Sequence, residues 1–200
     1  MTITNGYCTL VELKARLAIT DVTDDTMLEQ IITSVSRWID DYTARRFYAA
    51  AETRYYTATD TDLLKVYDLL SVTALKTDED GDRVYENTWA NTDFDLLPDN
   101  AVLDGEPYTK ISLTPYGNYY FPVGVRKGVL LQGTYGYCSA LTGKGATVKE
   151  ACLLQSERIF KRKDSPLGVA GMTVLGVQTV KVPGLDPDVQ EMLVHFRCVL

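Results

Sequence analysis

The side chains that could perform catalysis are few and scattered along the chain. The only histidine is His195, and no nucleophile motif accompanies it. A catalytic imidazole needs a nucleophile or an orienting carboxylate nearby, so a hydrolase would require His195 to lie near Cys198 or a serine. We interpret His195 as a packing or surface residue, and the sequence predicts no enzymatic activity.

The candidate metal ligands do not form a standard motif. Asp78, Asp80 and Asp82 alternate like the start of a calcium loop, but Gly81 stands at the fourth position and Trp89 replaces the bidentate glutamate. A hairpin turn is the better interpretation. The four cysteines, Cys8, Cys138, Cys152 and Cys198, include no Cys-x-x-Cys pair, which argues against zinc. We predict no metal or cofactor, a buried free thiol at Cys152 and a reducing compartment.

Two segments invite comparison with phosphate or nucleic-acid sites. Residues 143–147 (GKGAT) superficially resemble a phosphate loop but lack the required Gly-x-x-x-x-Gly-Lys-Ser/Thr pattern, so we interpret them as a flexible connector. Arg158 and residues 161–163 (KRK) form a basic cluster at the expected end of a helix. The cluster either complements the helix dipole and is solvated, or contacts nucleic acid or an acidic partner.

The composition is that of a globular protein. The chain has 200 residues, 46% of them hydrophobic, which fits one domain or a domain with an insertion. Its net charge of −7 disfavours a non-specific DNA binder, which would normally be basic. The sequence shows no secretion signal and no run of about 18 apolar residues that would predict a membrane span.

Residues 23–48 carry the clearest helical pattern. Apolar side chains recur there at the three- and four-residue spacing of one helix face. They are Met27, Leu28, Ile31, Ile32, Val35, Trp38, Ile39 and Tyr42. Thr23 is expected to cap the start, and Arg45 and Arg46 suit the negative end of the helix dipole. The rest of the chain must cover this apolar face.

Further helices are expected on both sides of a β-rich middle. A capping box at 9–12 predicts a helix over about 10–18, and Thr147 or a neighbour caps a helix over about 148–163. Asp186 and Pro187 begin a last helix that ends near residue 197. Three residues of the 148–163 helix lie off its main apolar face, which predicts a second contact, in the core or with another subunit. They are Leu153, Leu154 and Phe160.

The middle of the chain is rich in β-forming residues and turn signals. We expect strands at 52–59, 63–66, 71–76, 83–85, 92–97, 109–113 and 128–135, with 78–82 as a tight turn. A further hairpin is expected at 172–182, with its turn near Gly176. The predicted fold class is α+β: a helical bundle built from the N- and C-terminal helices, 1–50 plus 143–200, with an inserted small antiparallel β-domain, 52–138.

Several segments, taken in order, resemble the head–tail connector proteins of tailed bacteriophages, also called adaptor or head-completion proteins. These segments are 7–14 (YCTLVELK), 17–21 (LAITD), 39–48 (IDDYTARRFY), 148–154 (VKEACLL), 160–166 (FKRKDSP) and 185–193 (LDPDVQEML). The resemblance covers both helical ends and, more loosely, the β-rich middle.

The resemblance implies a structural virion protein of the neck. Such proteins assemble in the host cytoplasm as a homo-oligomeric ring, a dodecamer, below the portal protein. The ring extends the DNA channel, lets double-stranded DNA pass without specific binding, and presents a surface to the next neck or tail protein, a stopper or tail terminator. No membrane is involved. The net negative charge suits a channel through which DNA slides.

Carried onto this chain, the resemblance implies three groups of site residues. Leu153, Leu154 and Phe160 are candidates for the subunit interface. The short, weakly anchored C-terminal segment would dock on the portal through Pro187, Val189, Met192, Leu193, Phe196 and Leu200. Arg45, Arg46, Lys161 and Arg162 are family-signature or DNA-channel candidates. The alternatives are another phage neck or tail component, or a nucleic-acid clamp that gathers residues 158–163 and 45–46 on one face and binds DNA with steep salt dependence.

Overall fold

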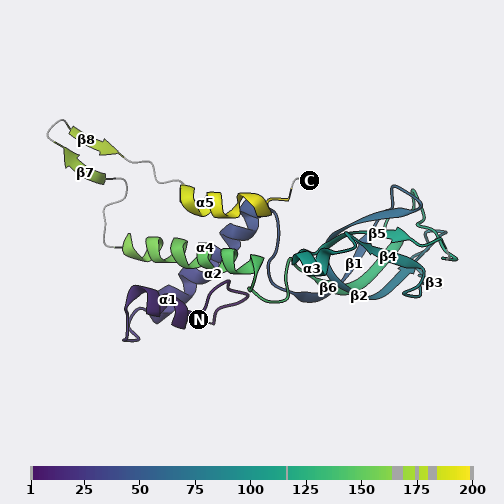
Figure 1. Ribbon diagram of the computed structural model, residues 1–200, viewed down its shortest axis with the longest axis horizontal. Helices are drawn as coiled ribbons and strands as arrows, with labels where there is room; N and C mark the ends of the chain where they lie inside the picture. The colour runs from purple at the N-terminus through teal and green to yellow at the C-terminus, as the bar shows by residue number, and fades with distance from the viewer. Residues whose placement is uncertain (1, 116, 164–168, 174–175, 180–183, 199–200) are drawn as a thin grey trace. The chain divides into compact units, whose positions relative to one another are not determined.

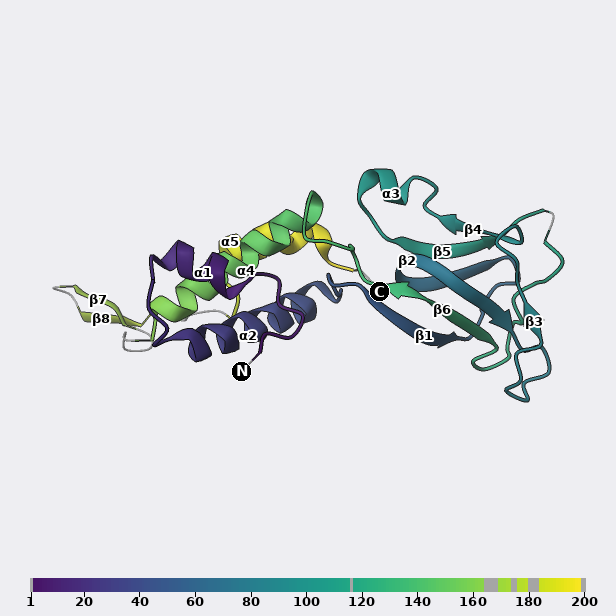
Figure 2. The same ribbon diagram turned by 90° about the horizontal axis from the view of Figure 1, so that it is seen from below.

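The computed structural model describes residues 2–115, 117–163, 169–173, 176–179 and 184–198 (Figures 1 and 2). The chain divides into two compact units, Met1–Arg45 with Leu141–Leu200 and Arg46–Ala140. We call these the helical unit and the sheet unit. Residues 46–50, which the sequence-based division placed with the helices, lie in the sheet unit, because they lead directly into its first strand. The fold is α+β, as expected from the sequence.

The helical unit is built from helices packed side by side (Figure 2). They are α1 (Leu10–Leu17), α2 (Asp25–Thr43), α4 (Lys144–Lys161) and α5 (Pro187–Leu193), followed by the 3-10 turn Val194–Phe196. α1 begins with the expected capping box: the backbone N–H of Glu12 donates to Thr9 Oγ1, and the Thr9 N–H donates to the Glu12 carboxylate. Asp24, not Thr23, occupies the N-cap position of α2 and makes no side-chain cap hydrogen bond, and the helix ends at Thr43, before either arginine.

The buried face of α2 is narrower than the apolar pattern suggests. Leu28, Ile32, Val35 and Ile39 are fully buried against α1 and α4. Met27 and Trp38, which we expected on the same face, are 39% and 43% exposed. They lie 11 residues apart, about three helix turns, so they share one edge of α2 that the helical unit leaves uncovered.

The start of α4 corrects two expectations. Gly143 is the residue before the helix, with φ of 54°, and α4 begins at Lys144. The segment 144–147 is therefore the first turn of the helix, not a flexible connector, and Thr147 lies inside the helix and does not cap it. The buried side of α4 includes Val148, Ala151 and Cys152.

The sheet unit contains one antiparallel sheet with strand order β1-β6-β2-β5-β4, and β3 pairs with the end of β2. Its elements are β1 (Ala50–Tyr56), β2 (Leu63–Thr77), β3 (Asn87–Thr88), β4 (Phe94–Leu97), the short helix α3 (Ala101–Asp104), β5 (Tyr108–Leu113) and β6 (Val129–Tyr135). The strands expected at 92–97, 109–113 and 128–135 are found close to those bounds. The two expected strands 63–66 and 71–76 are one long strand, bent by bulges.

The turn after β2 is longer than expected. Residues 83–85 are not a strand, and β3 returns only at Asn87. The cause is Asp78, whose carboxylate oxygens accept the backbone N–H groups of Gly81 at 2.7 Å and Arg83 at 2.9 Å and fold the loop back on itself.

The sheet core is aromatic and tightly packed. Trp89 stacks on Phe121 with ring centroids 4.8 Å apart, and its indole N–H donates to Thr77 Oγ1. Leu75 and Leu131 are fully buried beside them. At Gly133, a Cβ atom would lie 2.2 Å from the Ser71 carbonyl oxygen, so β6 passes too close to β2 for any other residue.

The hairpin expected at 172–182 consists of β7 (Val169–Thr173) and β8 (Gly176–Thr179), paired antiparallel. Gly176 starts the second strand, and residues 174–175 between the strands lie outside the described part of the chain. The last helix is shorter than expected, because its final turn is the 3-10 turn Val194–Phe196. Within the described residues, no helix is long and apolar enough to span a bilayer.

Candidate assembly surfaces

The basic cluster at the end of α4 is occupied by contacts within the chain. Arg162 Nη2 lies 2.8 Å from Asp186 Oδ1, and Arg158 lies 3.4 Å from the other Asp186 oxygen. Arg158 also makes a bidentate pair with Asp188. This pairing holds the pKa of Asp188 below its usual range. The two arginines therefore fix the start of α5 to the end of α4.

The two lysines of this cluster are paired as well. Lys161 Nζ lies 2.5 Å from Glu157, and Lys163 Nζ lies 2.9 Å from Asp24. Glu157 also accepts Arg16 Nε at 2.6 Å, and these two cations, Lys161 first, lower its pKa. A clamp would need its cations available for phosphates. Because each cation of residues 158–163 already faces a carboxylate, the positive potential of the cluster is largely offset.

Arg45 and Arg46 both follow the end of α2, which is at Thr43. Arg45 is half-buried and is the last residue of the first segment of the helical unit. Arg46 belongs to the sheet unit, where its guanidinium lies 2.5 Å from Glu52 and stacks 4.8 Å above the Tyr48 ring. Arg46 lowers the pKa of Glu52. Arg46 is thus a structural partner of β1 and does not sit at the helix dipole as we expected.

The predicted subunit-interface residues differ in exposure. Leu153 and Leu154 are half-buried on α4. Phe160 is only 8% exposed, and the Lys163 ammonium lies 4.3 Å above its ring. The second apolar side of α4 at Phe160 is therefore covered within the chain itself, whereas Leu153 and Leu154 keep surface for a neighbour.

The predicted portal-docking residues lie on a helix that is well anchored. Val189, Leu193 and Phe196 are buried, Met192 is half-buried and Pro187 is exposed; Leu200 lies outside the described residues.

Hydrogen bonds hold this segment at both ends. Gln155 Oε1 accepts the Asp186 N–H at 3.0 Å, Gln190 Nε2 donates to the Leu185 carbonyl at 2.7 Å, and the Cys198 N–H donates to the Thr43 carbonyl at 2.8 Å. The expectation of a weakly anchored C-terminal segment is wrong for residues 184–198.

The sequence analysis missed the exposed apolar residues of the helical unit. These are Val11, Val22, Met27, Trp38 and Val194. Val11 also borders a surface hollow of about 400 Å³ beside Leu10, Lys14 and Ile19. Tryptophan and methionine are enriched in protein interfaces relative to the rest of the surface. The exposure of Met27 and Trp38 could have been predicted in part from the sequence, because both residues lie at the edge of the apolar face of α2.

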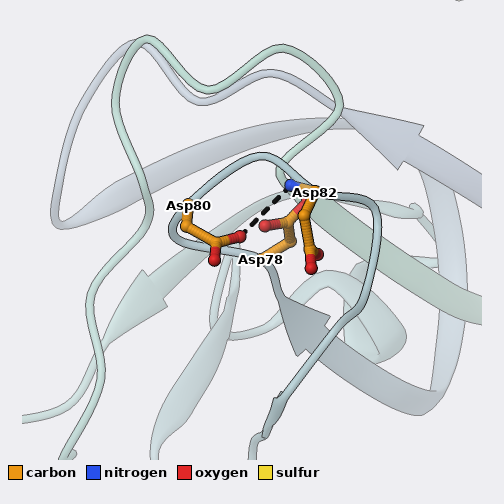
Figure 3. A group of neighbouring side chains, drawn as sticks. All are labelled: Asp78, Asp80 and Asp82. Carbon is orange, nitrogen blue, oxygen red and sulfur yellow. Dashed lines mark hydrogen bonds between the residues drawn. The ribbon is translucent and has the colours of Figure 1, made fainter.

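The described residues give no further support to a metal site at the three aspartates or to a catalytic site at His195. One carboxylate oxygen from each of Asp78, Asp80 and Asp82 lies within 4.8 Å of the others. Figure 3 shows these three side chains close together in the loop after β2. Asp80 accepts the Asp82 N–H at 3.2 Å, and each Asp78 oxygen accepts one of the backbone N–H groups described above, so these carboxylates stabilise the turn. His195 is exposed on the 3-10 turn, and among the described residues no hydrogen bond joins it to a cysteine or serine.

The chain is similar in fold to chains from the necks of gene transfer agent (GTA) particles. The chain aligns over 100% of its length with a chain of "Neck of empty GTA particle computed with C6 symmetry" (94% of that chain, 16% identity, TM-score 0.60). It aligns equally fully with one of "Neck of native GTA particle computed with C12 symmetry" (93%, 17% identity, TM-score 0.61). A chain of "Virion of native gene transfer agent (GTA) particle" aligns with TM-score 0.55 at 15% identity, covering 100% of this chain and 94% of that one. At these identities the likeness is one of fold.

The family comparison is more specific. Residues 7–88, from before α1 to β3, match the family described as "Phage gp6-like head-tail connector protein". No curated protein matches the chain significantly. The family match covers residues 7–88, and the likeness of fold extends over the whole chain. Both agree with the resemblance in the sequence.

Proposed function

We propose that this chain is a head–tail connector that forms a ring, a dodecamer, below the portal and extends the DNA channel toward the tail. The observation that carries the proposal is the coincidence of two independent comparisons: a connector-family match over the N-terminal helices and a full-length fold likeness to particle necks. In this proposal the portal and the next neck or tail protein are its partners, assembly occurs in the host cytoplasm, and the sheet unit is an inserted domain in a helical bundle.

We further propose that neighbouring copies meet at the uncovered edge of α2. Met27 and Trp38 share that edge, and their apolar surface is the type that heterologous ring contacts bury. The half-exposed Leu153 and Leu154 remain candidates for the opposing surface. Among the predicted portal-docking residues of α5, the exposed Pro187 and the half-buried Met192 keep surface available for the portal.

The interface can be tested with two substitutions of one residue. Trp38→Lys places a charge in the contact without disturbing the core, because Trp38 is exposed, whereas Trp38→Phe keeps an apolar ring. We expect native mass spectrometry with the portal to show oligomers for wild type and Trp38→Phe but not for Trp38→Lys. Circular dichroism should show all three folded. Equal assembly of the two variants would exclude this edge from the interface.

The structure gives no specific support to the alternative of a nucleic-acid clamp. Among the basic residues that a clamp would gather, Arg46, Arg158, Lys161, Arg162 and Lys163 are paired with carboxylates of the same chain. In our proposal, DNA passes through the ring without specific binding.

A further inference from the structure

Two cysteines far apart in the sequence meet inside the helical unit. The sulfur atoms of Cys8, in the segment before α1, and Cys152, in the middle of α4, lie 3.5 Å apart, although 144 residues separate them. Both side chains are buried. In the described part of the chain, neither Cys138 nor Cys198 has a sulfur contact of this kind recorded: Cys138 instead donates to the Phe47 carbonyl at 3.3 Å.

The surroundings of the pair are polar rather than purely apolar. Ser36 Oγ lies 3.6 Å from the Cys152 sulfur, accepts the Tyr7 N–H at 3.0 Å and donates to the Ile32 carbonyl at 2.7 Å. The contact between the two thiols, in which either sulfur can donate, couples their ionisation: it raises the pKa of Cys8 and lowers the pKa of Cys152. The two sulfur atoms are therefore held side by side as one interacting pair.

We infer that Cys8 and Cys152 form a redox site that peroxide closes into a disulfide. The thiolate of one cysteine of the pair attacks one oxygen of hydrogen peroxide, which forms a sulfenic acid and releases hydroxide, and the hydroxide takes up the proton that this thiol lost to become water. The sulfur of the other cysteine then attacks the sulfenic sulfur, forms the S–S bond and displaces the sulfenic oxygen as a second water, which carries away its own thiol proton. Two thiols and one peroxide thus give one disulfide and two waters.

Closure requires little movement. A disulfide has a sulfur–sulfur distance of about 2.05 Å, so the two atoms must approach by about 1.5 Å, which side-chain rotation and a small shift of the N-terminal segment can provide. The bond would tie that segment to α4 and close a long loop, which restricts the unfolded chain. A reducing cytoplasm keeps the pair open, and an oxidising extracellular medium favours closure.

The test uses the wild-type chain, treated with hydrogen peroxide and then denatured and alkylated. We expect a mass loss of about 2 Da before alkylation, two alkylated cysteines instead of four, and one linked peptide pair that joins Cys8 to Cys152. The melting temperature should rise by about 5 °C or more and return to its starting value with a reducing agent.

The control variant is Cys138→Ser/Cys198→Ser, which keeps the pair and should respond like wild type. Cys8→Ser should lose both the linked peptides and the peroxide-dependent rise in melting temperature. Four alkylated cysteines after treatment, linkage of other residues, or oxidation of Cys152 to sulfinic acid without a bond would each overturn the inference. The measurement on wild type decides the matter even if Cys8→Ser fails to fold.

Discussion

Arg162 and Asp186 form an ion pair that joins the end of one helix to the start of another. Arg162 follows the last turn of α4, Asp186 precedes the first turn of α5, and their side chains lie 2.8 Å apart. Asp186 occupies the N-cap position, but its carboxylate faces the arginines of α4 and makes no cap hydrogen bond to α5. A residue that we expected in a DNA channel thus serves the fold.

This pair predicts a stability effect. Asp186→Asn removes the carboxylate charge opposite Arg158 and Arg162. Because the Asp186 side chain is buried, water screens this ion pair little. We expect a loss of about 2 kcal/mol in the free energy of unfolding, measured by urea denaturation. The control Asp188→Asn breaks an exposed pair and should lower the free energy of unfolding much less. Equal losses for the two substitutions would contradict the conclusion that the Asp186 ion pair stabilises the contact between α4 and α5.

The capping box of α1 predicts a second effect on stability. Thr9→Ala removes the hydroxyl that accepts the Glu12 N–H at 3.2 Å, leaving that donor without its partner. A loss of about 1 kcal/mol in the free energy of unfolding is expected. Thr9→Ser keeps the hydroxyl and should lie within a few tenths of wild type. A neutral Thr9→Ala would mean that the helix start does not depend on the cap.

Three glutamates predict loss of stability in acid. The Thr9 N–H, the Arg46 guanidinium and the Lys161 ammonium hold the pKa values of Glu12, Glu52 and Glu157 below the ordinary 4.5. These groups stabilise the fold fully above pH 4.5. Their contribution falls as the pH drops through the lowered folded-state values, because the unfolded chain takes up protons first.

Urea unfolding measured from pH 7 to pH 3 checks this expectation. Glu157→Gln should flatten the acid slope, whereas Glu86→Gln, at an exposed position of the sheet unit, should leave the curve like that of wild type. If Glu157→Gln and wild type lose stability in parallel, the contacts of Glu157 with Lys161 and Arg16 do not contribute.

The paired basic cluster predicts weak DNA binding. Because Lys161, Arg162 and Lys163 face carboxylates, we expect low affinity for double-stranded DNA at physiological salt. Fluorescence anisotropy with a labelled duplex should detect little binding, and Lys161→Glu should change it little. Tight binding with a steep salt dependence that Lys161→Glu abolishes would instead favour the clamp.

The sequence predicted elements where one periodicity runs uninterrupted. The buried residues of α2 and strands β4 to β6 lie close to where their patterns placed them. β2 was split in two because the buried Asp68 interrupts the apolar pattern and bulges shift its register. We wrongly expected Trp38 to be buried. Its exposure depends on how far α1 and α4 extend around α2, which the pattern within α2 does not show.

Long-range partners were beyond the reach of sequence patterns. Arg162 meets a carboxylate 24 residues away, and Lys163 meets one 139 residues away. The Cys8–Cys152 contact spans 144 residues. Charge patterns therefore identified the basic cluster but left open whether it is solvated or contacts an external ligand, because only the packing of α5 and α2 on α4 brings the acidic partners to it.

The most direct test of the proposed function is electron microscopy of the full chain, imaged alone and after mixing with the portal protein from the same source. The account predicts rings with the symmetry of the portal, alone or only on the portal, at the face where the tail would attach. A chain that stays monomeric and leaves the portal undecorated would contradict the connector function.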